Sequence, residues 1–598
     1  MNAILRSLAA SAAAAVVLFG GPALAQQQRP VIEGEQLSDE LREFIGSKLA
    51  PRDAPGSPLA ARRQARDAGR TARDALNSRG YFDPKIETAV VSGPPLRPAV
   101  KIDPGPQFAI GEIDIDWQGD PPGDDASTAA RNAISLRSGE TAIPEKVLAA
   151  RAPLAEALRR ESHAFANVSG EEVVGDREAG TIRVTYKASA GPKVAFGEVL
   201  YPDTTRTRKA YIDKLVPFHS GEAYSPERLS ELNSRLSSTR LFDVARASLV
   251  KTASGTTDDG LAIHDVRLEL QDRPRNTIAL GGSFATDRGV GLDAEYTRRN
   301  LTGQGDFLTA ELTVAQLERM LDLEWNRPNR FGYGRAMIWR ARLDQEETDA
   351  FDRRAVEIGA RLENTRNPRF TYSLGVDAAL VRETARVDLR SDRVEERNLQ
   401  LVTFGAGAQI DQADSTLDPR AGWRADLLVE PTAGFGGAQS QFIRSTAQLR
   451  AYLPVDDDKR TVLAGRVKLG TAFGAEIGDL PTDRRFFAGG GGSVRGYGYQ
   501  AIGPRTPDGT PLGGRSLAEA SLEARHMIRD QVEIVAFVDA GTVTDDETFG
   551  FENVRVGAGL GARYHTMAGP IRVDVGVPLD KSPFDDPFQV YLSIGQSF

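Results

Sequence analysis

The stretch V-R-V-G-A-G-L-G-A-R-Y, residues 554–564, alternates strictly between two kinds of side chain. Every even position is apolar, and every odd position is arginine or glycine. A period of two is typical of a β-strand that has one apolar face and one polar face. The stretch I-R-V-D-V-G-V at 571–577 repeats the pattern. We therefore predict two neighbouring strands here, each apolar on one side.

The same alternation continues through the second half of the chain, from Asn276 to Phe598. The segments are about ten residues long, which is the length that a tilted strand needs to cross a bilayer. We count about sixteen candidate strands, an even number as in bacterial single-chain barrels. A soluble β-sandwich or propeller would also alternate, but the long helix-free run and the terminal aromatic residue favour a membrane protein. We predict an all-β transmembrane barrel of about sixteen antiparallel strands over 274–598.

Composition excludes several classes of function. The chain has 598 residues, no cysteine and a formal net charge of −9. The lack of cysteine excludes disulfides, cysteine-ligated zinc and thiol nucleophiles. The acidic balance gives no general attraction to nucleic acid, so no nucleic-acid partner is expected. No run of 18 apolar residues follows residue 25, which excludes a membrane-spanning helix.

Catalytic motifs are also absent from the sequence. The five histidines have no metal-ligand spacing, and neither a Gly-Lys dipeptide nor a Gly-x-Ser-x-Gly motif occurs. Gly557-x-Gly559-x-x-Ala562 fits a dinucleotide fingerprint in form, but it lies inside an alternating strand with no helix after it. We therefore expect no enzymatic activity, no catalytic residues, no cofactor and no metal.

Residues 1–25 have the features of a secretory signal. Arg6 precedes an apolar stretch, and Ala23-Leu24-Ala25 offers small residues for cleavage. The apolar stretch is too short to cross a bilayer as a helix, and a buried N-terminal helix is the alternative. We predict a signal peptide over 1–25 and a mature chain that starts at Gln26 and leaves the cytoplasm.

A threefold repeat fills the first half of the mature chain. GPQFAIGEI at 105–113 returns as GPKVAFGEV at 191–199, and SGETAIPEKV at 138–147 returns as SGEAYSPERL at 220–229. In each unit an alternating strand is followed by helical periodicity and then by two more strands. The order β-α-α-β-β predicts a three-stranded sheet covered by two helices. We assign α+β modules to residues 26–104, 105–190 and 191–273.

These modules resemble POTRA domains, the periplasmic repeats of outer-membrane assembly and secretion proteins. The resemblance implies that their exposed sheet edges bind strands of a partner or a substrate. A three-stranded sheet does leave edges that can accept an added strand. The alternative is that the modules are spacers.

A glycine-rich stretch in the barrel half carries a second resemblance. G-G-G-G-S-V-R-G-Y-G at 489–498 should not form a stable strand, because four consecutive glycines leave the backbone too free. It resembles the VRGF/VRGY motif of the same superfamily, which lies on a loop folded into the lumen. The matching residues are Val494, Arg495, Gly496 and Tyr497. The family pairs that arginine with an F-x-D-x-G strand motif, matched here by Phe537, Asp539 and Gly541.

The parity of this strand supports the pairing independently. If the apolar even positions 532–538 face lipid, Asp539 must face the lumen. A carboxylate and a guanidinium that are both partly desolvated in a narrow lumen should pair. The alternative is that Arg495 is a solvated loop charge. The segments at 414–423 and 566–579 also resemble signatures of the family.

The barrel must close where its first strand, about 277–285, meets its last, about 589–598. Glycines in the first strand weaken side-chain packing, so we expect a labile lateral seam. Its residues are Ile278, Leu280, Gly281, Gly282, Val590, Leu592, Ile594 and Phe598. An open seam would present unpaired backbone groups to a substrate strand, in a medium where each unpaired group costs several kcal/mol.

Three modules before a barrel resemble the TamA branch of the BamA/TamA outer-membrane assembly superfamily. The resemblance implies insertion of nascent β-barrel proteins, including autotransporters, into the outer membrane of a Gram-negative bacterium, with the modules in the periplasm. It also implies a TamB-like inner-membrane-anchored periplasmic partner, contact with outer-membrane lipid and a role in phospholipid transport. The alternatives are a BamA-like general assembly protein, a two-partner-type polypeptide secretion pore and a lipid-conducting tether between membranes.

Overall fold

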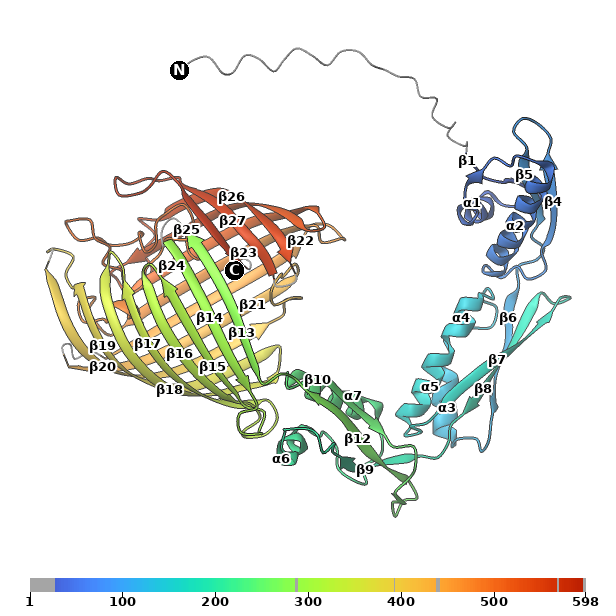
Figure 1. Cartoon of the computed structure of the whole chain (residues 1–598), viewed down its shortest axis with the longest axis horizontal. Coiled ribbons are helices and arrows are strands. Elements are labelled where there is room, and N and C mark those ends of the chain that lie inside the picture. The colour runs from blue at the N-terminus through green and yellow to red at the C-terminus, as the bar shows by residue number, and fades with distance from the viewer. Residues whose placement is uncertain (1–26, 286–288, 392, 437–440, 567–568, 595–598) are drawn as a thin grey trace, which may run out of the picture. The chain divides into compact units, whose positions relative to one another are not determined.

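The computed structural model describes residues 27–285, 289–391, 393–436, 441–566 and 569–594, and Figure 1 shows the ribbon. The predicted signal peptide and Phe598 lie outside the described residues. Contacts divide the chain into two compact units, which are described separately. The first unit runs to Val199 and adds 218–230 and 249–266. The second contains 200–217, 231–248 and everything from Arg267 onward.

The first repeat module packs two helices on a three-stranded sheet of order β2-β5-β4. Serine side chains start both helices: Ser38 Oγ accepts from the Leu41 N–H, and Ser57 Oγ accepts from the Ala60 N–H. A buried stripe of alanines on the second helix allows it to lie close to the sheet. The elements are β1 (Gln27–Gln28), β2 (Val31–Glu33), α1 (Asp39–Lys48), β3 (Arg52–Asp53), α2 (Pro58–Asn77), β4 (Lys85–Val91) and β5 (Arg97–Asp103).

The second module has a sheet of order β6-β8-β7, in which β6 runs parallel to β8 and β7 antiparallel to it. Tyr186 on β8 is buried, and its hydroxyl donates to the Val147 carbonyl over 2.8 Å, which ties the sheet to a helix. The elements are β6 (Ala109–Trp117), α3 (Asp124–Ala133), α4 (Pro144–Ala149), α5 (Arg151–Arg160), β7 (Asn167–Asp176) and β8 (Thr181–Ser189).

The third module repeats this plan with a sheet of order β10-β12-β11, in which β9 also pairs with β12. All three modules therefore have a strand, then helices, then further strands, which confirms the predicted α+β repeats. The third sheet differs from the expected three strands because the short strand β11 also joins it. The elements are β9 (Val194–Leu200), α6 (Lys209–Ile212), η1 (Asp213–Leu215), α7 (Pro226–Ser238), β10 (Phe242–Leu249), β11 (Gly255–Thr256) and β12 (Ala262–Asp272).

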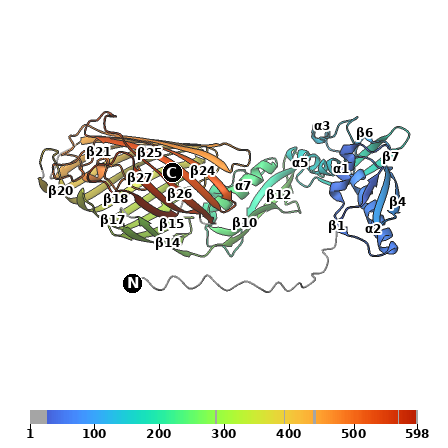
Figure 2. The ribbon, with the colours of Figure 1, turned by 90° about the horizontal axis from the view of Figure 1, so that it is seen from above.

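Sixteen strands of the described chain, β13 to β28, form one closed barrel in which each strand is antiparallel to the next, as predicted. Their tilt is visible in Figures 1 and 2. The first eight are β13 (Asn276–Ala285), β14 (Gly289–Arg299), β15 (Phe307–Ala315), β16 (Glu318–Arg327), β17 (Arg335–Glu347), β18 (Phe351–Asn367), β19 (Phe370–Arg386) and β20 (Val394–Asp411). The others are β21 (Gly422–Gly436), β22 (Gln441–Pro454), β23 (Thr461–Phe473), β24 (Ser516–Arg529), β25 (Val532–Thr544), β26 (Arg555–Thr566), β27 (Gly569–Pro578) and β28 (Gln589–Ile594).

Strand parity separates an apolar outer face from a lumenal face. On β25 the even positions Ile534 and Val538 are exposed on the outside, whereas Phe537 and Asp539 are buried inside. The outward apolar residues lie on the surface of the barrel that lipid would cover in a membrane. No helix among the described residues is long and apolar enough to cross a membrane.

Candidate functional site

The connection between β23 and β24, residues 474–515, folds into the barrel, and we call it the lumenal loop. Its motif is buried: Val494, Arg495 and Tyr497 are exposed by 2% or less. Gly496 has φ of +100°, a conformation that favours glycine. The loop includes the short 3-10 helix η2 (Thr482–Arg484).

The structure brings Arg495 and Asp539 together. The Arg495 Nε and Nη2 atoms donate to the two oxygens of Asp539 over 2.7 and 2.9 Å. The Arg495 backbone N–H donates to the same carboxylate over 3.1 Å. The guanidinium lies 3.5 Å from the centroid of the Phe537 ring. A bidentate pair with a cation–π contact fixes both the position and the orientation of the loop.

Two further carboxylates extend this pair into a cluster. Arg495 Nη1 donates to Glu523 on β24 over 2.6 Å and to Asp574 on β27 over 3.1 Å. Arg563 on β26 and Arg572 on β27 also pair with Asp574. The three carboxylates are fully buried, so each depends on these guanidinium partners for its stability. Glu523 and Asp574 were not among the site residues predicted from the sequence, although strand parity places both on the lumenal face.

The cluster keeps Arg495 charged. Burial alone would lower the pKa of its guanidinium. The hydrogen bonds to Asp539 and the charges of Glu523 and Asp574 outweigh burial and raise the pKa above its ordinary value. The guanidinium of the docked loop is therefore positively charged.

Glycines in the barrel wall make room for the loop backbone. A Cβ atom at Gly557 would lie 1.9 Å from the Arg495 carbonyl oxygen, and one at Gly576 would lie 2.7 Å from the Gly496 nitrogen. A Cβ atom at Gly541 would lie 2.6 Å from the Val494 side chain. Close packing against the loop thus explains why Gly541 of the F-x-D-x-G motif is a glycine. It also explains Gly557, the first glycine of the apparent dinucleotide fingerprint on β26.

We expect Gly557→Ala to displace the loop, because the added methyl group would overlap the Arg495 carbonyl. The free energy of unfolding should fall by about 1–3 kcal/mol, measured by urea denaturation in detergent. Gly405→Ala is the matched control, because a Cβ at Gly405 on β20 meets no atom within 4 Å. Equal effects of the two substitutions would contradict the steric account.

The ladder between β13 and β28 is the shortest in the described barrel. It has two pairs, Phe284 with Leu592 and Ala285 with Tyr591. On its other side β13 makes ten pairs with β14, and β28 makes six with β27. Both seam pairs lie at the C-terminal end of β13, so the rest of this strand has no β28 partner among the described residues.

The predicted seam residues are distributed unevenly over this ladder. Leu592 takes part in a seam pair, and Val590 lies two residues before it on β28. The four predicted residues of β13 have no β28 partner in the described chain, and Ile278 and Leu280 are 71% and 80% exposed. These four are Ile278, Leu280, Gly281 and Gly282. Ile594 ends β28, but its side chain, like the whole of Phe598, is outside the described part.

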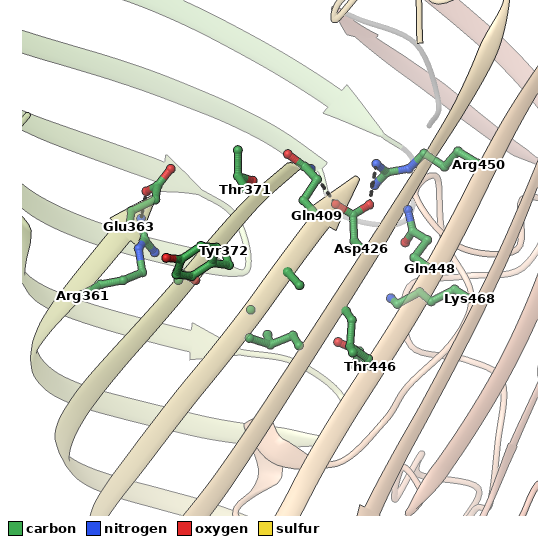
Figure 3. Close-up of a pocket in the computed structure, with 15 residues that line it drawn as sticks. Arg361, Glu363, Thr371, Tyr372, Gln409, Asp426, Thr446, Gln448, Arg450 and Lys468 are labelled. Carbon is green, nitrogen blue, oxygen red and sulfur yellow. Dashed lines mark hydrogen bonds and ion pairs between the residues drawn. The ribbon is translucent and has the colours of Figure 1, made fainter. Parts of the chain in front are cut away.

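Elsewhere the lumen wall is polar. A cavity of about 380 Å³ lies against β18 to β23, and Figure 3 shows its lining. Asp426 accepts from Gln409 over 2.6 Å and from Arg450 over 3.2 Å, while Lys468 lies nearby. Such a lining is typical of a hydrated barrel interior. Within the described ranges no three His, Asp or Glu side chains are grouped to hold a metal ion.

Comparison with known proteins identifies the family of the barrel half. A family described as "Omp85 superfamily domain" matches residues 300–598, half of the chain. BamA, the outer membrane protein assembly factor of Nitratidesulfovibrio vulgaris, is 24% identical over 70% of this chain and 53% of its own length. The chain thus spans about half the length of that relative. BamA of Neorickettsia risticii is 23% identical over 88% of this chain and 71% of its own.

A solved structure has a similar fold. The crystal structure of BamA from Haemophilus ducreyi lacking POTRA domains 1–3 has a TM-score of 0.68 at 17% identity, covering 82% of this chain and 100% of that one. The names of both BamA relatives describe outer membrane protein assembly factors. The chain therefore belongs to the Omp85 superfamily, as an outer-membrane β-barrel with POTRA-like modules in the periplasm.

Proposed function

We propose that the protein inserts β-barrel proteins into the outer membrane, using the seam between β13 and β28 as a template. The observation that carries this proposal is the seam between these strands, where Phe284–Leu592 and Ala285–Tyr591 are the backbone pairs found among the described residues. Over the described residues this ladder has fewer pairs than any other in the barrel, so the fewest backbone hydrogen bonds would have to break for the wall to open there. In lipid an open strand edge is strongly driven to find a new partner.

A substrate strand would supply that partner. The seam-side backbone of β13 from Asn276 to Gly282 has no β28 partner in the described chain. When the seam opens, a nascent strand could pair with β13, and its next strand could pair with the first, so that a new barrel grows from the edge. This exchange of hydrogen bonds needs neither a nucleotide nor covalent chemistry. Arg495 and Asp539 would hold the lumenal loop against the barrel wall while the seam opens and closes.

The periplasmic modules would deliver substrates to the barrel. In the second module β7 is an edge strand, and its Val173 and Val174 are about half exposed. An extended polypeptide can add to such an edge through backbone hydrogen bonds. We also propose the boundaries 26–104, 105–190, 191–273 and 274–598 as those of the three modules and the barrel.

The test is reconstitution of the purified full chain into liposomes. An unfolded β-barrel substrate should fold faster in these vesicles than in empty ones, as read from its heat-modifiable band on a gel. If the protein were a secretion pore, the substrate would instead cross the bilayer and stay unfolded. Equal folding in both kinds of vesicle would contradict the proposal.

Two assembly roles remain to be separated. The names of the relatives favour a BamA-like general assembly factor. The three modules in this chain favour the TamA-like role, with autotransporter substrates, a TamB-like partner and phospholipid transport. A pull-down in mild detergent separates them. A large inner-membrane-anchored partner indicates the TamA-like role, and a set of small outer-membrane lipoproteins indicates the BamA-like role.

A further inference from the structure

Tyr591 lies where the lumenal loop meets the seam. Its backbone pairs with Ala285 across the short β13–β28 ladder. Its side chain points into the barrel and is 2% exposed. The hydroxyl donates to the Tyr497 carbonyl over 3.2 Å and accepts from the Gly496 N–H over 3.2 Å. One residue of the last strand therefore bonds to two residues of the Val494–Tyr497 motif.

A second part of the loop packs on the same ring. A Cβ atom at Gly491 would lie 2.8 Å from the Tyr591 ring, so the loop backbone passes directly over it. Arg572 on β27 donates to the Gly491 carbonyl over 3.0 Å. The last two strands are thus fastened to the loop both before the motif, at Gly491, and within it.

The first strand shows no comparable attachment at the side chains that the structure describes. Its described lumenal positions 277, 279 and 281 hold the small residues threonine, alanine and glycine. Thr277 bonds to Arg299 on the neighbouring strand β14. Among the β13 residues whose side chains are described, none forms a hydrogen bond with the lumenal loop. Over the residues that the structure describes, the two edges of the seam therefore differ: β28 is held by the loop from inside, and β13 pairs with β14 along ten residues.

We propose that Tyr591 couples docking of the loop to closure of the seam. The Tyr591 hydroxyl holds β28 in the position where it pairs with β13, so that undocking the loop releases the last strand. Because such coupling is reciprocal, closure of the seam also favours the docked loop. Tyr591 is thus a positioning residue for the seam, and its importance for assembly rests on the function proposed above.

The test uses an engineered disulfide as a reporter of closure. Phe284 and Leu592 are directly opposed across the seam, and the chain has no other cysteine. Opposed antiparallel residues have Cβ atoms about 4.5–5.5 Å apart, near the range of a disulfide. The rate of disulfide formation in purified Phe284→Cys/Leu592→Cys protein therefore measures how often the seam is closed, without any substrate.

Adding Tyr591→Phe should slow the cross-link on the order of tenfold, because two hydrogen bonds are lost while the ring remains. Tyr564→Phe is the matched control. Tyr564 is a half-exposed tyrosine on β26 whose hydroxyl bonds to Gln531 away from the loop. It should leave the rate unchanged. An unchanged or faster rate with Tyr591→Phe, or an equal slowing by both, would overturn the proposal.

A double-variant comparison separates coupling from simple destabilisation. Arg495→Lys keeps the charge but loses the bidentate geometry, so it should loosen the loop and slow the cross-link. In the Tyr591→Phe background, Arg495→Lys should reduce the rate of disulfide formation by a further factor of less than about two, because the link between the loop and the seam is already broken. If the fold reductions caused by the two substitutions multiplied fully in the double variant, the proposed coupling would be overturned. These rates involve no substrate, so failure of the assembly function would leave them unaffected.

Discussion

An engineered disulfide across the seam, in the Phe284→Cys/Leu592→Cys protein, is expected to abolish barrel insertion. The disulfide would join β13 and β28 at a directly opposed pair across the seam. A substrate strand could then no longer replace β28 beside β13. We expect the folding rate of the substrate in proteoliposomes to fall to that of empty vesicles. Reduction of the disulfide should restore the original rate.

The control is a disulfide that leaves the seam free. Leu280 and Ala294 are paired across β13 and β14, two strands with a continuous ladder. The Leu280→Cys/Ala294→Cys protein carries the same chemical modification on the same strand. Its oxidised form should insert substrates at the normal rate. Full activity of the seam-locked protein would show that insertion does not pass through the seam.

Arg495→Ala is expected to have the largest effect of any single substitution in the lumen. Asp539 would lose its bidentate partner, and Glu523 and Asp574 would each lose an ion pair. Removing one side of a buried ion pair costs roughly 3–5 kcal/mol. The loop should therefore leave the wall, and trypsin should cleave it at its remaining arginines. Substrate insertion should fall at least about tenfold, since the loss far exceeds the roughly 1.4 kcal/mol that corresponds to tenfold.

Arg382→Ala is the matched control for that substitution. Arg382 on β19 pairs with Glu396, but both side chains are at least half exposed. Exposed pairs contribute about 0–1 kcal/mol, so little change in stability or insertion is expected. If Arg495→Ala left the loop protected from trypsin, the buried cluster would not be what holds it.

The fold could largely be predicted because local sequence patterns determine it. Alternation over 554–564 and 571–577 identified strands β26 and β27, and the parity of 532–538 placed Asp539 in the lumen. These inferences need only neighbouring residues, since side chains on a strand alternate between two faces. The repeated GPQFAIGEI-like segments likewise marked the first strands of the second and third modules.

The site could be predicted only in part because it depends on register across strands. Parity places Glu523 and Asp574 in the lumen, but their depth depends on how four strands align beside Arg495. The sequence does not distinguish Tyr591 from the other inward residues of the last strand, because its contact with the lumenal loop depends on the path of that loop. The register with which β28 meets β13 at the seam is likewise specified by no local pattern.

The central claim is that substrates pair with the β13 edge in the membrane. It is tested most directly by cross-linking a stalled substrate, bearing one cysteine in its last strand, to single cysteines in this protein. Ile278→Cys marks the β13 edge, and Gln409→Cys marks the polar lumen wall. We predict cross-links to position 278 and none to 409. Cross-links to 409 alone would mean that the polypeptide passes through the lumen, and would contradict the account.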